Sequence, residues 1–351
     1  MAREKLCVGI DIGASAVKLC QLKKTAKGTT VEAFGRVELP SDTVVDSALM
    51  SSARVVDAIV ELIEVHRIKR KQVALSVSGH SVIIKKIPLP QMTRAELETQ
   101  IQWEAEQFIP FDIGDVYLDV QIVNEQSVQQ GQMDVVLVAA KKEFVNEYTS
   151  VIIEAGLEPM ICDVDAFAVE TMFAVNYEIP ETETIALVNV GAAKTNINIL
   201  ALGVSSFTRD LAIGGKTFTE EIQKQLNVSQ ENAELLKLGG TVRDAASVVP
   251  QDVEQAMQTV AENVTTEVQR SIDFYSATSA EPSPSEIYLS GGSARLPALS
   301  RAIEARIGVP VTVVNPFKEL HPGNVDPAYL QEVGPSAAVA VGLALRFPGD
   351  C

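Results

Sequence analysis

Two short stretches of the chain place a polar residue, a glycine and an alanine in the same order between apolar flanks. Residues 11–18 read DIGASAVK, and residues 189–196 read NVGAAKTN. Apolar residues flank both, so each stretch predicts a strand, a tight turn and a second strand. Successive N–H groups in such a small-residue turn form a nest that binds anions. The repetition predicts two hairpins that hold one polyphosphate from opposite sides.

Side chains in the first stretch fit a phosphate bound together with a metal ion. Gly13 and Ala14 let the backbone approach an anion, Ser15 adds a hydroxyl donor and Lys18 adds a positive charge. Asp11 would repel a bare phosphate, so its position indicates a hydrated Mg2+ between the carboxylate and the phosphates. Taken singly, each stretch is also explained as an ordinary β-hairpin with a small turn.

Two further glycine turns have the same character. Gly214 and Gly215 precede a predicted helix, and Gly291, Gly292 and Ser293 follow a short apolar strand. The strand, double-glycine turn and helix N-terminus around Gly291 suit a nucleoside or its α-phosphate. Alone, this turn is also explained as a packing device between a strand and a helix.

Composition limits the classes of function. The chain has 351 residues, 46% of them hydrophobic and 21% charged, with a net charge of -17. These values predict a globular protein with room for two domains, and they exclude a nucleic-acid binder. The basic cluster at 67–71 is interpreted as a solvated helix end. Because no apolar run reaches about 18 residues, we expect membrane association only through partners.

Cysteines and histidines add two expectations. The four cysteines lack metal or redox spacing and predict a reduced, cytoplasmic protein; they are Cys7, Cys20, Cys162 and Cys351. The three histidines are scattered, so no zinc site is expected; they are His66, His80 and His321.

Apolar periodicity divides the chain into two lobes. Residues 1–183 form the predicted first lobe, and residues 184–351 form the second, with a helical subdomain at about 214–285. A β-α-β-β-α block at about 80–158, with its own minor core, interrupts the first lobe. A small-residue-rich helix at 334–346 is expected to pack back on the first lobe. The order predicts an α/β fold of mixed sheets covered by helices.

Three local patterns add sharper expectations. Residues 46–65 have the apolar spacing of one helix. Pro88 and Pro90 are expected to end a strand at about residue 87. Thr93 followed by Glu96 predicts a helix that opens with a capping box.

The order of these features resembles the actin-like ATPase superfamily, which has a ribonuclease H-like fold and includes actin, Hsp70, sugar kinases and FtsA. Within it, the chain resembles most the PilM family of type IV pilus assembly. The resemblance covers essentially the whole chain, in phrases such as GIDIGASAVKL, CDVDAFAVETMF, YLSGGSARLPAL and GPSAAVAVGLALR. It implies two lobes, with the block at about 80–158 as an FtsA-type small inserted subdomain.

The resemblance also implies a site for ATP or ADP with Mg2+. Asp11 would hold Mg2+ through water. The phosphates would lie between two sets of residues, namely Gly13, Ala14, Ser15 and Lys18 on one side and Asn189, Gly191, Ala192 and Thr195 on the other. Gly214 and Gly215 would approach the α- and β-phosphates. Glu234 and Lys237 would grip the ribose and base, or form only a surface ion pair, and Gly291, Gly292 and Ser293 would line the adenosine pocket.

Two positions bear on hydrolysis. The superfamily usually has Asp where this chain has Asn189, so we expect ATP to bind with weak or no hydrolysis. Asp165 lies where related ATPases keep an acid that polarises the attacking water. It can equally be an ordinary helix N-cap.

The implied function is an ATP-binding cytoplasmic adaptor, peripheral to the inner membrane. It would bind the N-terminal tail of PilN in a groove between the first lobe and the inserted block, and so link PilN to the membrane platform and the pilus motor ATPases. Self-association into a homodimer or filament stays open. The alternatives are an FtsA-like filament or division protein, a GspL-like component of type II secretion and a sugar-kinase-like phosphotransferase. An FtsA-like protein is expected to carry an amphipathic anchor, a GspL-like protein a membrane span, and a sugar kinase an acidic base near a polyol pocket.

Overall fold

The computed structural model describes residues 5–26, 28–125, 131–179, 182–241 and 250–350. Two five-stranded sheets have the same plan, in which three antiparallel strands are followed by two parallel ones. The first sheet is ordered β3-β2-β1-β6-β10, with bounds Gly28–Glu38, Ala16–Thr25, Val8–Ile12, Gln72–Val77 and Glu158–Val164. The second is ordered β13-β12-β11-β14-β15, with bounds Val204–Leu211, Thr195–Ala201, Thr184–Val190, Glu286–Ser290 and Val311–Val313. We call each sheet with its helices a lobe.

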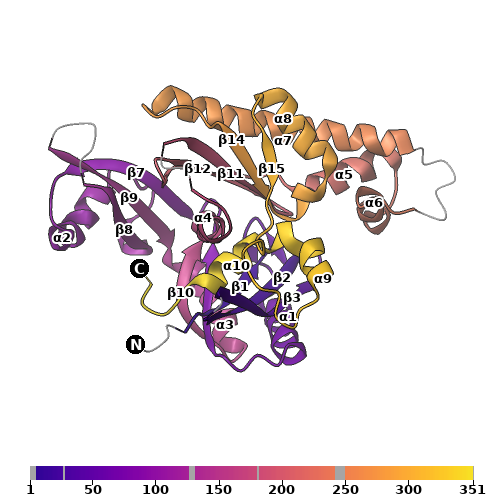
Figure 1. Cartoon of the computed structure of the whole chain (residues 1–351), viewed down its shortest axis with the longest axis horizontal. Helices are drawn as coiled ribbons and strands as arrows, with labels where there is room; N and C mark the ends of the chain where they lie inside the picture. Colours follow the sequence, from indigo (N-terminus) through magenta and orange to yellow (C-terminus); the bar gives the residue numbers. More distant parts are fainter. Residues whose placement is uncertain (1–4, 27, 126–130, 180–181, 242–249, 351) are drawn as a thin grey trace.

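Helices cover both faces of the first sheet. On one face lie α1 (Ser52–Val65) and α3 (Lys142–Glu154), which share a core with β1, β2 and β6. On the other lie α4 (Asp165–Asn176) and α10 (Ala338–Leu345), which Figure 1 shows between the two sheets. A Cβ on Gly342 would lie 1.7 Å from the Ala168 carbonyl oxygen, so these helices cross at a distance that only glycine permits.

The second sheet packs against α5 (Gly215–Leu226), α7 (Pro250–Thr278) and α8 (Pro297–Ile307). Shorter helices α6 (Gln230–Lys237) and η2 (Gly292–Arg295) complete the lobe. Helices α9 (Pro327–Val333) and η3 (Gly334–Ala337) instead place their buried residues in the core shared with β3 and α10. The predicted breaks in the helical stretch after residue 229 fit the gap between α6 and α7, although residues 242–249 lie outside the described ranges. Within the described residues, no helix is both long enough and apolar enough to cross a membrane.

The inserted block forms a three-stranded sheet ordered β7-β9-β8, with bounds Val82–Pro90, Gln132–Lys141 and Val116–Asn124. Helix α2 (Arg94–Ala105) and the turn η1 (Ile113–Asp115) complete it, with a separate small core. The last helix of the predicted block, α3, instead packs its apolar face into the core of the first lobe. The capping box is confirmed, since the Thr93 N–H donates to Glu96 Oε2 at 2.7 Å and the Glu96 N–H donates to Thr93 Oγ1 at 3.3 Å.

Two of the local expectations are wrong. Strand β7 continues through Pro88 and Pro90, because it is an edge strand and prolines two residues apart direct their missing N–H groups away from β9. The helix expected from residue 46 begins at Ser52, after a small hairpin of β4 (Val44–Val45) and β5 (Ala48–Leu49). Asp46 and Ser47, at the tip of this hairpin, have positive φ angles, which are incompatible with a right-handed helix.

Candidate functional site

Strand register brings the polar residues of the first lobe together. Asp11 on β1 is the direct partner of Lys18 on β2, and the Lys18 ammonium lies 2.7 Å from the Asp11 carboxylate. The side chains are only 12% and 14% exposed, so the pair is held away from bulk water. Turn residues 13–15 lie between these strands, where the Gly13 N–H donates to the Ala16 carbonyl oxygen at 3.0 Å.

Asp165 lies at the same edge of the first sheet, because the carboxyl ends of parallel strands β1, β6 and β10 coincide there. It is the first residue of α4, and the N-cap position is Val164, so the N-cap interpretation does not hold. The carboxylate accepts hydrogen bonds from the hydroxyls of Ser76, at 2.6 Å, and Ser78. Burial raises the pKa of Asp165, but Lys194 and the two hydroxyls together lower it below its usual value.

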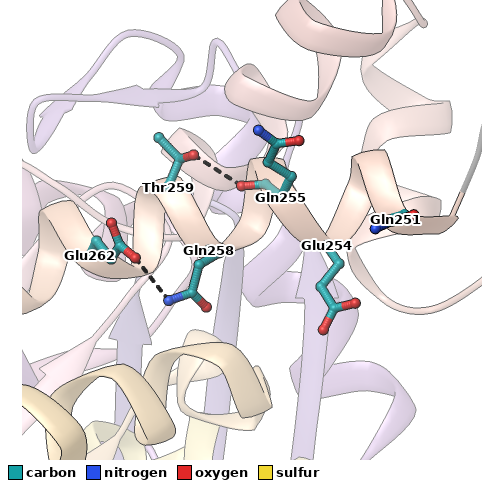
Figure 2. A pocket seen from close by; sticks show the side chains of 6 residues that line it. All are labelled: Gln251, Glu254, Gln255, Gln258, Thr259 and Glu262. Carbon is teal, nitrogen blue, oxygen red and sulfur yellow. Dashed lines mark hydrogen bonds between the residues drawn. The ribbon is translucent and has the colours of Figure 1, made fainter.

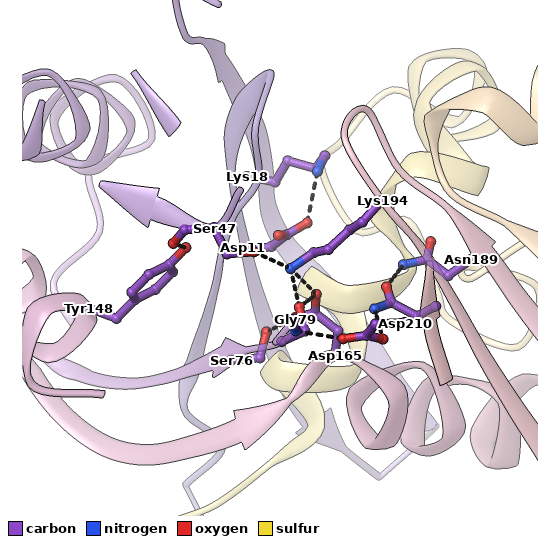
Figure 3. A network of polar contacts seen from close by, with 12 residues as sticks. Asp11, Lys18, Ser47, Ser76, Gly79, Tyr148, Asp165, Asn189, Lys194 and Asp210 are labelled. Carbon is purple, nitrogen blue, oxygen red and sulfur yellow. Dashed lines mark hydrogen bonds and ion pairs between the residues drawn. The ribbon is translucent and has the colours of Figure 1, made fainter. Parts of the chain in front are cut away.

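Lys194 crosses from the second lobe to this group of residues (Figure 3). Its ammonium donates to the Ser78 hydroxyl and, at 3.2 Å, to the Ser47 hydroxyl, and it lies 3.5 Å from Asp165 Oδ2. Ser47 is at the tip of the β4–β5 hairpin, where its carbonyl oxygen accepts a hydrogen bond from Tyr148 at 2.8 Å. The second hairpin therefore contacts three separate segments of the first lobe through one side chain.

The corresponding position in the second lobe carries amides. Asn189 on β11 is the partner of Asn196 on β12, and its Nδ2 donates to Asn196 Oδ1 at 3.2 Å. Asn196 Nδ2 donates in turn to Asp210 Oδ1 at 2.6 Å, and Asp210 Oδ2 accepts the N–H of Gly79 from the first lobe at 2.5 Å. Burial raises the pKa of Asp210, a shift that the Asn196 hydrogen bond and Lys194 partly offset.

The turn of the second hairpin is packed against Gly214 and Gly215. A Cβ on Gly214 would lie 2.7 Å from the Gly191 carbonyl oxygen and 2.8 Å from that of Ala192. The Gly215 N–H donates to Gly191 O at 2.8 Å, and the Ser293 hydroxyl donates to the same oxygen at 3.3 Å. The start of α5 and the loop after β14 thus meet at the second hairpin.

The remaining predicted residues extend this contact. Thr195 Oγ1 donates to Ile213 O at 2.8 Å, which ties β12 to the segment before Gly214. The Lys237 ammonium lies 2.6 Å from Glu234 Oε2 and donates to Gly215 O at 3.2 Å. The Lys237 side chain is 10% exposed and that of Glu234 is 46% exposed, so the pair lies at the surface with its ammonium directed inward to Gly215.

Gly291 and Gly292 differ in the room around them. Gly291 has a φ of +91°, and a Cβ there would meet the Val190 carbonyl oxygen at 2.3 Å, whereas a Cβ on Gly292 would meet nothing within 4 Å. The first glycine is required by packing, and the second leaves open space beside Ser293. That space is compatible with the predicted adenosine pocket.

This donor set fits a polyphosphate with a bound Mg2+. Ammonium groups and hydroxyls from both lobes supply hydrogen-bond donors, and the small turns let backbone N–H groups approach an anion. The Asp11 carboxylate is the hard oxygen ligand that Mg2+ prefers. Among the described residues, no three His, Cys, Asp or Glu side chains are grouped closely enough to hold a metal ion by themselves.

The sequence interpretation missed Ser47, Ser78, Lys194 and Asp210. Lys194 lay inside the repeated stretch but was given no role. Its contact with Ser78 joins residues 116 positions apart, and the Asp210 contact with Gly79 joins residues 131 apart. A local pattern gives no signal for such contacts, although a lysine next to a predicted phosphate turn is itself a signal.

Two hollows lie away from this site. One, of about 280 Å³, separates β10 from β8 and is lined mainly by apolar side chains, with Asp119 and Asp163 among them. The other, of about 490 Å³, runs along α7 and is lined by residues of that helix alone, all Gln, Glu or Thr (Figure 2). Because only this helix lines the second hollow, no other element contributes side chains to a binding site there. Of the four cysteines, Cys7, Cys20 and Cys162 are free thiols, and Cys351 lies outside the described ranges.

Comparisons with known proteins point to one family. A family model described as type IV pilus assembly protein PilM matches residues 9–347. The chain is also similar to a chain of a solved PilM-PilN type IV pilus biogenesis complex, at 30% sequence identity, with a TM-score of 0.85 and coverage of 98% of both chains.

Two more distant structures share the fold. One is the ethanolamine utilization protein EutJ from Carboxydothermus hydrogenoformans, at 16% identity and a TM-score of 0.58, covering 98% of this chain and 93% of that one. The other is MreB5 of Spiroplasma citri bound to AMPPNP, at 11% identity and a TM-score of 0.53, covering 96% and 94%. These similarities confirm the predicted actin-like fold of two lobes.

Proposed function

The chain belongs to the PilM family of type IV pilus assembly proteins, and from that premise we propose that it binds ATP and Mg2+ between its lobes and a PilN tail beside them. In this proposal it is a cytoplasmic adaptor that reaches the inner membrane through PilN, the platform protein and the pilus motor ATPases. One observation carries the nucleotide part: the two lobes have hairpins in the same topological position, and Lys194 of the second hairpin reaches Asp165 at the edge of the first sheet where Asp11 lies.

Each part of the nucleotide would have its own residues. Asp11 would hold the hydrated Mg2+, while the turns at 13–15 and 191–193 and the start of α5 would take the phosphates. Glu234 and Lys237 would contact the ribose and base from α6, beside Gly215. When bound, ATP would supply a triphosphate bridge that fixes the orientation of one lobe against the other.

Hydrolysis is expected to be slow. Asn189 is neutral and its amide is already bonded to Asn196, so it offers no carboxylate to orient a water. The carboxylate of Asp165 is engaged by two hydroxyls and Lys194, and its lowered pKa makes it a weak proton acceptor. Nucleotide binding without rapid turnover suits a protein that acts by its conformation.

The groove between β10 and β8 is our candidate for the PilN tail. It lies between the first sheet and the inserted block, where an edge strand of each sheet borders it. Edge strands can accept an extended peptide, and the apolar lining would take its alternate side chains. The Asp119 carboxylate favours a peptide that also carries a positive charge, whereas Asp163 is already paired with Arg346 at 2.7 Å.

The two proposed sites share one strand. Cys162, Asp163 and Val164 line the groove, and Asp165 follows them directly. A peptide that shifts the end of β10 would therefore also shift the residue that holds Lys194. This continuity supports an adaptor in which nucleotide and peptide affect each other's binding.

A calorimetric titration tests the peptide site with a matched pair of variants. A synthetic PilN N-terminal tail is titrated into the wild type and into Cys162→Arg, which fills the groove. Met160→Arg is the control, since Met160 is an exposed residue of the same strand outside the groove. We expect loss of binding only in Cys162→Arg. Equal binding by both variants would contradict this location, and no binding by the wild type would contradict PilN as a partner.

A further inference from the structure

We propose that Lys194 is a phosphate-binding residue that is held by the first lobe until a nucleoside triphosphate draws its ammonium away. This inference rests on the proposed nucleotide site. It adds a residue to which neither the repeated pattern nor the family resemblance gave a role. Asp165, Ser47 and Ser78 form the holding site.

The backbone of Lys194 is fixed while its side chain can move. Its carbonyl oxygen accepts a hydrogen bond from the Gly191 N–H at 2.9 Å, which closes the hairpin turn. The hydroxyl of the next residue, Thr195, donates a hydrogen bond to the Ile213 carbonyl oxygen. The ammonium stands at the end of four methylene groups, so it can change partners without any change in the turn. The residue is therefore anchored at the predicted phosphate turn but can reach the opposite lobe.

A comparison with Lys18 shows that Lys194 is more exposed and lies farther from its carboxylate. The Lys18 ammonium is 2.7 Å from a carboxylate and its side chain is 14% exposed, whereas the Lys194 ammonium is 3.5 Å from its carboxylate and 28% exposed. Its other two acceptors are neutral hydroxyls of serine. A terminal phosphate offers several charged oxygens in exchange, and such charge-assisted bonds are roughly twice as strong as neutral ones.

The holding site can release the ammonium without leaving a bare carboxylate. Asp165 keeps its hydrogen bonds from Ser76 and Ser78 after Lys194 leaves. Loss of the ammonium also removes one of the influences that lower the pKa of Asp165. The two serine hydroxyls, which remain, still act to lower the pKa of Asp165 and stabilise its carboxylate.

The position of the holding site indicates which phosphate is involved. Asp165 and Ser76 lie at the sheet edge where Asp11, the proposed Mg2+ residue, also lies. Mg2+ in such sites usually binds the terminal phosphates. We therefore expect Lys194 to distinguish a triphosphate from a diphosphate.

Calorimetry with Mg2+·AMPPNP and Mg2+·ADP tests this in the full chain. We expect Lys194→Met to weaken AMPPNP binding by about tenfold or more, and ADP binding by less than about threefold, as loss of one charged hydrogen bond predicts. Lys86→Met is the control, because Lys86 also joins the lobes, through Glu281, but belongs to the inserted block and contacts none of these residues. An equal loss in both variants, or no loss in Lys194→Met, would overturn the proposal.

A double-mutant cycle separates the holding step from simple electrostatics. Asp165→Asn should strengthen AMPPNP binding, because Lys194 is no longer held, and this gain should vanish in the Lys194→Met background. A gain that persists in that background would show that only the negative charge matters, and would contradict the holding role. In nucleotide-free protein, the same two substitutions should shift the urea midpoint non-additively. If the wild type binds neither nucleotide, the proposed function itself fails; if it binds both and Lys194→Met is unaffected, only this inference fails.

Discussion

The two lobes have the same strand order and the same hairpin register but different chemistry at the paired position. In the first lobe, Asp11 faces Lys18 and forms a tight ion pair. In the second, Asn189 faces Asn196, and the two amides are linked by a single hydrogen bond. The fold repeats, but the charges do not, so one half of the proposed site supplies ionic groups and the other supplies backbone and amides.

This difference shows how a duplicated fold can divide the work of binding one ligand. Of the two paired positions, only that on β1 carries the carboxylate that suits Mg2+, and the neutral Asn189 of the second hairpin does not repel the phosphates. The one cation of the second hairpin, Lys194, is directed to the first lobe. The asymmetry leads to tests in which each half is altered separately.

The largest effect is expected from Asp11→Asn. The substitution removes the charge that would hold Mg2+ and weakens the partner of Lys18, so Mg2+·ATP affinity should fall by about a hundredfold. Calorimetry with and without Mg2+ measures this. Without Mg2+ the variant should bind ATP no worse than the wild type, because the carboxylate then only repels phosphate. An equal loss in both conditions would argue against a metal at Asp11.

Gly214→Ala comes next and tests the support of the second hairpin. The new methyl group would lie within 2.8 Å of two carbonyl oxygens of its turn, and we expect the free energy of unfolding to fall by about 2 to 3 kcal/mol. Gly13→Ala is the counterpart in the first hairpin, where the nearest atom is a carbonyl oxygen at 3.1 Å, and it should cost about 1 kcal/mol. Urea denaturation of both compares them. If Gly13→Ala costs more, the two turns are not packed as described.

Asn189→Asp makes the second hairpin acidic like the first. The new carboxylate would face Asn196 Oδ1, whose amide nitrogen already donates to Asp210, so we expect a loss of about 1 to 2 kcal/mol. Burial should raise the pKa of the new group, so its charged form costs stability and the loss should grow as pH rises from 5 to 8. Urea denaturation at both pH values measures this.

A second substitution sharpens that test. In Asn189→Asp with Asp210→Asn, the Asn196 amide can rotate and donate to the new carboxylate while it accepts from the new amide at 210. The double variant should recover most of the lost stability. If the double variant loses more free energy of unfolding than the two single variants together, the hydrogen bonds among residues 189, 196 and 210 do not determine the loss.

Sequence patterns predicted the local parts of this site and not the contacts between lobes. Neighbouring residues determine the turns at 13–15 and 191–193 and the capping box at Thr93, so the local sequence predicts them. The β4–β5 hairpin was missed because residues 46 and 47 adopt positive φ angles without the glycine that usually marks such a turn. The lobe boundaries stay predictions, and so do the roles of the site residues, which depend on a ligand that a local pattern does not contain.

The smallest effect is expected from Lys86→Met. This substitution removes an ion pair between the inserted block and the second lobe that lies outside both hairpins. The Lys86 ammonium is 2.9 Å from Glu281 Oε1, and both side chains are about one-fifth exposed, so the loss should be about 1 kcal/mol or less. Glu281 keeps hydroxyl donors from Ser206 and Ser279.

The pH dependence of that loss is the more specific test. Burial raises the pKa of Glu281, but the Ser279 hydroxyl and Lys86 lower it below its usual value of 4.5. A carboxylate whose pKa is lower in the folded than in the unfolded protein adds stability. This stability is fully present above the pKa of the unfolded protein, and it is lost as the pH falls through the pKa of the folded protein. The difference between wild type and Lys86→Met should therefore shrink between pH 7 and pH 3 in urea denaturation. A loss that is equal at both pH values would show that the methylene packing of Lys86, and not its charge, ties the inserted block to the second lobe.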